Sequence, residues 1–270
     1  MARMSSMPFG FPEFRGATRR LILANLIAYF ALLVLGFAAA STARIAFGLL
    51  SFQPELFLHG YLWQPLTYSF MHVGLLPTLF DLLSLWFLAG FLEGYRDSKW
   101  VMSLYAASVL GSAVTAAVIW EVAQRLGHFE NVQLYGCMGG IFGMLVAIGV
   151  LFGNTEFMMF FVINIKAKYL AIIYALIAFA MVFSKSWIFA FAQLGGGLAG
   201  LLFIRYAPRR GVGFAASEWF YGLRNGYYRW KRRRAGRKFE VYMKKQGRTI
   251  RLDNRGRPVD DDSNDPGRWN

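Results

Sequence analysis

The chain has 270 residues, of which 56% are hydrophobic, 17% aromatic and only 16% charged. This composition excludes an ordinary soluble domain and indicates an integral membrane protein. The formal net charge of +14 is concentrated in the C-terminal tail, where 18 Lys and Arg residues from Arg205 onward stand against 7 acidic residues.

Six apolar segments follow one another along the chain, and each is long enough to cross a bilayer as a helix. They cover residues 21–40, 74–92, 100–120, 136–153, 166–183 and 187–206. We therefore predict an all-α membrane domain of six spans over residues 21–206. A cytoplasmic N-terminal segment, residues 1–20, would precede it, and a basic cytoplasmic tail, residues 207–270, would follow it.

The connection between the first two segments, residues 41–73, is long and half apolar. Its apolar residues include Leu49, Phe52, Leu56, Phe57 and Trp63. Such a composition is unusual for a solvated loop. We therefore predict that the connection lies in or on the outer interface of the membrane.

The placement of Lys and Arg indicates the orientation, because cytoplasmic loops carry an excess of these residues. One side has Arg15, Arg19, Arg20, Arg96, Lys99, Lys166, Lys168 and the basic tail, whereas the opposite connections carry only Arg44, Arg125 and Lys185. Both termini are therefore predicted to be cytoplasmic. Residues 1–20 lack an apolar signal-peptide core, and with this topology we expect a bacterial inner (cell) membrane protein.

Two glycine pairs are spaced four residues apart, Gly139 with Gly143 and Gly196 with Gly200. Residues at this spacing share one face of a helix, and a strip of glycine lets another backbone approach closely. Generic helix packing would explain either pair alone. Together they predict that the fourth and sixth helices pack face to face.

The tail begins with an aromatic and basic stretch. Its residues are Trp219, Leu223, Tyr227 and Trp230 at helical spacing, followed by Lys231, Arg232, Arg233 and Arg234. This pattern is typical of an amphipathic helix on an anionic lipid surface, and a merely solvated tail is the alternative. Nucleic acid could use the same charges, but we do not expect it as a partner because the segment follows directly from a span. A turn is predicted at Asp253–Gly256, and the acidic end reads as disordered.

Four segments of the membrane domain carry motifs in a fixed order. They are Trp63–His72, Glu93, Gly136–Gly143, and Ala192–Gly196 followed by Gly200. This ordered set resembles the rhomboid family of intramembrane serine proteases, in which the segments enter span two, end span two, carry the nucleophile and carry the general base. The resemblance covers residues 18–206 with matching spacing, and it implies a rhomboid-like bundle of six transmembrane helices.

The positions that match the rhomboid catalytic dyad are Met138 and Gln193. The resemblance implies a serine nucleophile at the first position and a histidine base at the second. A thioether has no proton to lose, and a neutral carboxamide does not titrate near physiological pH. Because nucleophile and base act as a unit, these residues predict a protein without serine peptidase activity.

The positions that match the family's oxyanion-stabilising region are His72, Pro77 and Asp81. The resemblance implies histidine, histidine and asparagine there. An amide donates to a developing oxyanion, whereas an ionised carboxylate would repel it. Proline removes a backbone donor and can kink a helix. Asp81 is either a protonated or hydrogen-bonded acid in a vestigial cavity or a contact for a polar group of a client protein.

Cys137 is the only cysteine and the one candidate for a substitute nucleophile, with His72 as its base. It lies one residue from the nucleophile position, about 100° around a helix, and a small apolar filler needs no catalytic role. His59, His72 and His128 have no metal-ligand spacing and no matching carboxylate or thiolate cluster. We therefore predict no metal site and no cofactor.

The expected function is that of a rhomboid-like pseudoprotease in the lipid bilayer. The resemblance implies this role, since inactive rhomboid relatives bind transmembrane helices of client or partner membrane proteins as adaptors or chaperones. The docking surface would be the vestigial cleft between spans two and five. One alternative is an accessory structural subunit of a larger membrane complex, with the tail aromatics docked on a partner. Another is endopeptidase activity retained by Cys137 and His72.

Overall fold

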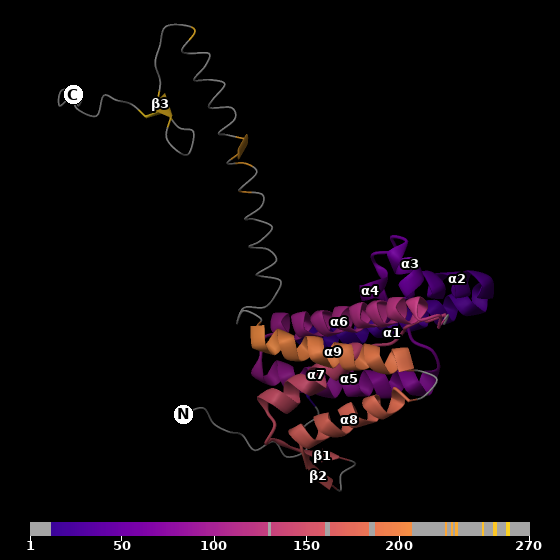
Figure 1. Cartoon of the computed structure of the whole chain (residues 1–270). Helices are drawn as coiled ribbons and strands as arrows, with labels where there is room; N and C mark the ends of the chain where they lie inside the picture. Colours follow the sequence, from indigo (N-terminus) through magenta and orange to yellow (C-terminus); the bar gives the residue numbers. More distant parts are fainter. Residues whose placement is uncertain are drawn as a thin grey trace, which may run out of the picture. The chain divides into compact units, whose positions relative to one another are not determined.

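The computed structural model describes residues 12–128, 131–159, 163–183 and 187–206, and in the tail residues 225, 228, 230, 231, 245, 251–252 and 258–259. The chain divides into two compact units, Met1–Val212 and Gly213–Asn270. The described part of the first unit is a bundle of helices with one small hairpin (Figure 1).

Each of the six apolar segments forms a helix. These helices are α1 (Gly16–Ala38), α5 (Leu75–Tyr95), α6 (Ser98–Arg125), α7 (Met138–Leu151), α8 (Ala167–Met181) and α9 (Trp187–Tyr206). By length and composition, α1, α5, α6 and α9 are candidate membrane spans, whereas α7 and α8 are shorter apolar helices. The described residues thus form a mostly helical integral membrane protein with four candidate spans.

The connection from α1 to α5 is largely helical. It contains α2 (Ala40–Leu50), α3 (Pro54–Leu58), α4 (Gln64–Thr67) and the short 3-10 helix η1 (Tyr68–Phe70). Phe52 and Leu134 exchange two backbone hydrogen bonds, of 3.0 and 2.8 Å, and the Gly136 N–H donates to the Tyr68 carbonyl at 3.1 Å. The connection is therefore tied to the segment that leads into α7. Its place at the outer interface stays a prediction.

A β-hairpin that the sequence did not predict follows α7. Its strands β1 (Glu156–Met159) and β2 (Ile163–Lys166) pair antiparallel, with Glu156 opposite Lys166 and Met159 opposite Ile163. Short apolar runs fit a strand as well as a buried helix by periodicity alone. The cross-strand pairing decides between the two for this segment.

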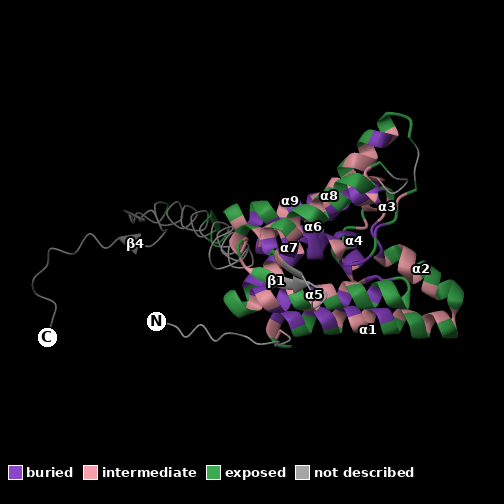
Figure 2. Ribbon diagram, turned by 90° about the horizontal axis from the view of Figure 1, so that it is seen from below, coloured by how far each residue is buried: buried purple, intermediate pink, exposed green. Residues whose placement is uncertain are grey.

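The core lies where α6 packs against α7 and α9 (Figure 2). The buried face of α6 includes Leu104, Ser108, Ser112 and Ala116. The small side chains of Ser108, Ser112 and Ala116, at helical spacing, let the neighbouring helices approach closely. In α7, buried residues occur on nearly every side, as expected for a helix that is apolar all round.

The tail is described only at scattered positions. Trp230 and Lys231 are helical and exposed, whereas the other residues of the predicted amphipathic stretch, Trp219, Leu223, Tyr227 and Arg232 to Arg234, lie outside the described residues. Strands β3 (Arg251–Leu252) and β4 (Pro258–Val259) pair antiparallel. They flank the segment in which the sequence predicts a turn.

Candidate functional site

The first feature of the site is a backbone-to-backbone contact between α7 and α9. A Cβ on Gly196 would lie 2.6 Å from the carbonyl oxygen of Gly139, and a Cβ on Gly200 would lie 2.8 Å from that of Gly143. On the α6 side, a Cβ on Gly139 would lie 2.7 Å from the side chain of Ser112. The two glycine pairs therefore face each other, at a separation that leaves no room for a side chain.

The glycine motif also determines where α7 begins. Gly136 has φ +87°, a left-handed conformation that glycine adopts without steric cost. Cys137 is the N-cap residue, and Met138 is the first residue of the helix. The predicted helix start is therefore present, and it lies inside the protein because both Gly136 and Cys137 are buried.

Met138 and Gln193, the two dyad positions, line the same small cavity together with Tyr68, Ser112 and Gly139. The volume of this cavity is about 10 Å³, roughly that of one water-sized sphere. The structure therefore brings the two positions together. The space that they share can hold one water and no peptide group.

Glu93 lies near the C-terminal end of α5 and forms hydrogen bonds with the first turn of α1. Its carboxylate accepts from the Ala17 N–H at 2.7 Å, from the Thr18 N–H at 3.0 Å and from the Thr18 hydroxyl at 2.7 Å. The Ser98 hydroxyl, at the start of α6, donates to the same carboxylate. Amides in the first turn of a helix have no partner within that helix. Glu93 therefore caps α1 from a neighbouring element and joins three helices.

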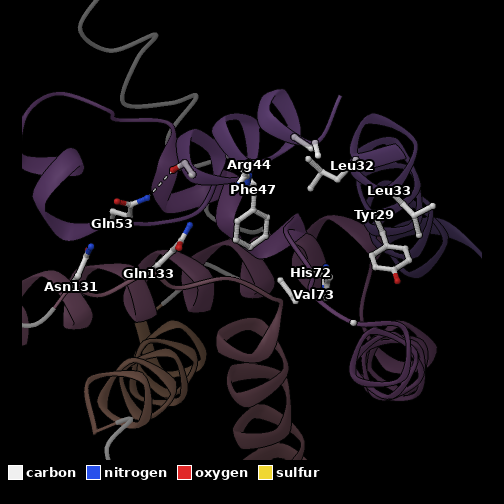
Figure 3. Close-up of a pocket in the computed structure, with 15 residues that line it drawn as sticks. Tyr29, Leu32, Leu33, Arg44, Phe47, Gln53, His72, Val73, Asn131 and Gln133 are labelled. Carbon is white, nitrogen blue, oxygen red and sulfur yellow. Dashed lines mark hydrogen bonds between the residues drawn. The ribbon is translucent and has the colours of Figure 1, made fainter. Parts of the chain in front are cut away.

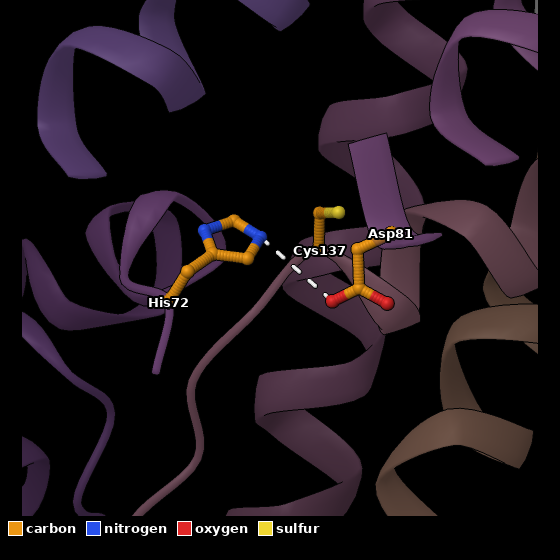
Figure 4. Close-up of side chains that lie close together, drawn as sticks. All are labelled: His72, Asp81 and Cys137. Carbon is orange, nitrogen blue, oxygen red and sulfur yellow. Dashed lines mark ion pairs between the residues drawn. The ribbon is translucent and has the colours of Figure 1, made fainter. Parts of the chain in front are cut away.

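A cluster of three side chains lies beside the start of α7 (Figure 4). It consists of His72 from the loop before α5, Asp81 from α5 and Cys137, and one ligand atom of each lies within 4.8 Å of the others. The distance from His72 Nε2 to Asp81 Oδ2 is 3.8 Å, which is too long for a hydrogen bond. The dashed line in Figure 4 marks this pair, which is an ion pair only if His72 is protonated, so three side chains that can ligate a metal lie together without a hydrogen bond among them.

The surroundings of His72 determine its protonation state. Its Nδ1 lies 3.3 Å from the carbonyl oxygen of Phe70, and because a carbonyl can only accept, Nδ1 carries the proton. Burial lowers the pKa of His72 from its ordinary value of 6.5, and the hydrogen bond to Phe70 opposes this effect more weakly. The ring is therefore neutral at neutral pH. Nε2 is buried and has no hydrogen-bond partner among the described residues.

This cluster corrects the reasoning behind the prediction of no metal site. That prediction compared the spacing of the three histidines along the chain, but the donors come from three separate segments and only His72 is a histidine. Two features of the sequence single out the other two members, an acid inside an apolar span and a cysteine beside the glycine motif, but neither feature indicates that the three residues meet. His59 and His128 are exposed residues outside the cluster.

Pro77 has a smaller effect than the sequence suggested. It is the third residue of α5, where a backbone N–H would have no partner within the helix. The missing donor therefore costs no helical hydrogen bond. The Thr78 N–H next to it still reaches the carbonyl of Gly74 at 3.4 Å.

A groove of about 940 Å³ opens beside His72 (Figure 3). Tyr29 of α1, Arg44 and Phe47 of α2, and the loop residues Gln133 and Val73 contribute to its walls. The sequence predicted a cleft between spans two and five. This groove is a different surface, since it lies between α1, α2 and the loop before α5.

Comparison with known families shows which family the chain matches. Residues 22–219 match the family described as "Eukaryotic integral membrane protein (DUF1751)", and this range includes all the helices of the first unit except the first turns of α1. No curated protein matches the chain.

The family description overturns the predicted location. A family of eukaryotic integral membrane proteins contradicts a bacterial inner membrane, so that prediction was wrong. The positive-inside rule indicates which side of a membrane a loop occupies, and it carries no information on which organism or membrane is involved. The integral membrane character is confirmed.

Proposed function

The chain belongs to the family of eukaryotic integral membrane proteins (DUF1751), and we propose that it is a rhomboid-like pseudoprotease that binds transmembrane segments of other membrane proteins. One observation carries the proposal: Met138 and Gln193 line a single cavity of about 10 Å³. Neither side chain serves as nucleophile or general base. A site filled in this way holds helices together and has no means of cutting a peptide bond.

The rhomboid-like architecture requires α7 and α8 to act as the fourth and fifth spans. The 14 residues of α7 extend about 21 Å, whereas the hydrocarbon core is about 30 Å thick. Non-helical backbone is tolerated at membrane depth where protein buries it. The segment before α7 fits this condition, because Leu134 and Cys137 are buried and Leu134 and Gly136 form hydrogen bonds with the connection.

The proposed docking surface is formed by the outward faces of α5 and α8, the second and fifth spans. Leu79 and Leu83 of α5 and Ile172 and Leu176 of α8 are large apolar side chains that stay exposed. In lipid, helices associate through van der Waals packing and polar contacts.

Site-specific photo-crosslinking tests this docking surface. A photoreactive amino acid at Leu79 or Leu176 is expected to form protein adducts in native membranes. The matched control is Ile27 on α1, which is 68% exposed but lies on another helix. We expect several-fold more adduct from α5 and α8 than from Ile27. Equal yields at all three positions would contradict a specific docking surface.

The tail is proposed to be a cytoplasmic helix on anionic lipid. Trp230 and Lys231, which are helical and exposed, support this assignment. In the accessory-subunit alternative the same residues would contact a permanent partner. Native purification in mild detergent separates the two, because a subunit would bring down a stoichiometric partner set and an adaptor would bring down varied, substoichiometric clients.

Retained peptidase activity depends on Cys137, and its burial weighs against this alternative. The side chain has no exposed surface, so the thiol cannot reach a peptide carbonyl unless the start of α7 opens. If cleavage of a transmembrane substrate were observed and lost in Cys137→Ala, this alternative would replace the pseudoprotease.

A further inference from the structure

The His72, Asp81 and Cys137 cluster has the donor set of a transition-metal site. It offers an imidazole nitrogen, a carboxylate oxygen and a cysteine sulfur, which binds a metal as the thiolate. Zinc accepts all three kinds of ligand, and three protein ligands with one open position are typical of its catalytic sites. We propose that these three residues bind a zinc ion whose fourth position stays open to an exogenous ligand.

The strongest support is the buried nitrogen of His72. The His72 side chain is only 2% exposed, and its Nε2 has no hydrogen-bond partner among the described residues. A buried polar atom without a partner is costly. Metal-ligating histidines usually donate their other ring N–H to a carbonyl or carboxylate. The contact from Nδ1 to the Phe70 carbonyl, 3.3 Å long, has this form.

The geometry needs only small adjustments. With zinc–nitrogen and zinc–oxygen distances of about 2.0–2.2 Å and a zinc–sulfur distance of about 2.3 Å, ligand atoms around a tetrahedral ion lie roughly 3.4–3.6 Å apart. His72 Nε2 and Asp81 Oδ2 are 3.8 Å apart, and all three ligand atoms lie within 4.8 Å of one another. The three ligand atoms would draw closer together when the ion binds.

Charge balance also favours a divalent ion at this buried cluster. A thiolate and a carboxylate together carry two negative charges, and the neutral imidazole of His72 adds none. A divalent cation makes the sum zero, which removes most of the cost of placing charge in a low-dielectric environment. The groove of about 940 Å³ borders the cluster on the side of His72.

Zinc binding by the purified protein tests the inference. The full chain, isolated with an affinity tag that lacks histidine and stripped with a chelator, is titrated with zinc chloride against a chromogenic competitor. We expect one ion per chain. Asp81→Asn, His72→Asn and Cys137→Ala each remove a ligand and are expected to weaken binding by more than the roughly 10–100-fold that loss of an outer-shell partner costs. The control His128→Asn, at an exposed histidine outside the cluster, should bind as the unchanged protein does.

A cobalt spectrum makes the test independent of variant folding. Cobalt(II) bound by the unchanged protein should show the near-ultraviolet charge-transfer band of a cobalt–thiolate bond. Absence of stoichiometric binding, absence of this band, or folded variants that bind as tightly as the unchanged protein would each overturn the proposal. These outcomes are distinct from those of the crosslinking experiment, because a client helix can dock on α5 and α8 with or without the ion.

Discussion

Gly196→Val is expected to destabilise the membrane domain severely. The valine Cβ would lie 2.6 Å from the carbonyl oxygen of Gly139 and 3.0 Å from its Cα. These are backbone atoms of a buried helix, so they cannot swing aside as the end of a flexible side chain can. α7 and α9 would have to separate, with a loss of at least about 3 kcal/mol in the free energy of unfolding.

The matched control for this change is Gly94→Ala. Gly94 lies on α5 near its end, and a Cβ there meets nothing within 4 Å. Alanine should therefore leave stability unchanged or raise it by about 0.5–1 kcal/mol, because glycine lowers the stability of a helix. Unfolding in detergent followed by tryptophan fluorescence measures both. Equal stability of Gly196→Val and Gly94→Ala would contradict the close contact of α7 with α9.

Glu93→Ala should cost about 2–4 kcal/mol of stability. It removes an acceptor of hydrogen bonds from Ala17, Thr18 and Ser98. The first-turn amides of α1 would then lose their cap. Glu93→Gln should lose less, because one amide oxygen can still accept, although its NH₂ group would face donors.

A surface acid provides the control for Glu93. Glu121 forms an exposed pair with Arg125, four residues further along α6, and such pairs contribute about 0.3–0.5 kcal/mol. Glu121→Gln should therefore shift the same unfolding transition only slightly. A Glu93→Ala protein as stable as Glu121→Gln would show that the cap on α1 is not needed.

The parts of the fold that could be predicted depend on local patterns. Apolar length identified the helices, and the spacing of Gly139 with Gly143 and of Gly196 with Gly200 indicated a close contact because only a small residue allows one. Glu93 was singled out through the resemblance to the rhomboid family, which has a glutamate at the end of its second span. Its partners Ala17 and Thr18 could not be foreseen, since the cap depends on where the start of α1 lies in three dimensions.

The parts that could not be predicted depend on contacts between distant segments. The hairpin β1–β2 forms through cross-strand pairing, which an apolar run does not reveal. His72, Asp81 and Cys137 come from three separate segments, and the connection before α5 is hydrogen-bonded to the segment before α7. The sequence named each of these residues as a candidate, but it contained no signal for their mutual distance.

A pseudoprotease binds its client protein and leaves it intact. The mass of the photo-crosslinked adduct from Leu79 tests this claim most directly. We expect a mass equal to this chain plus a full-length client, with the client's transmembrane segment uncut after prolonged incubation. An adduct that contains a truncated client, or release of a client fragment that depends on Cys137, would contradict the account.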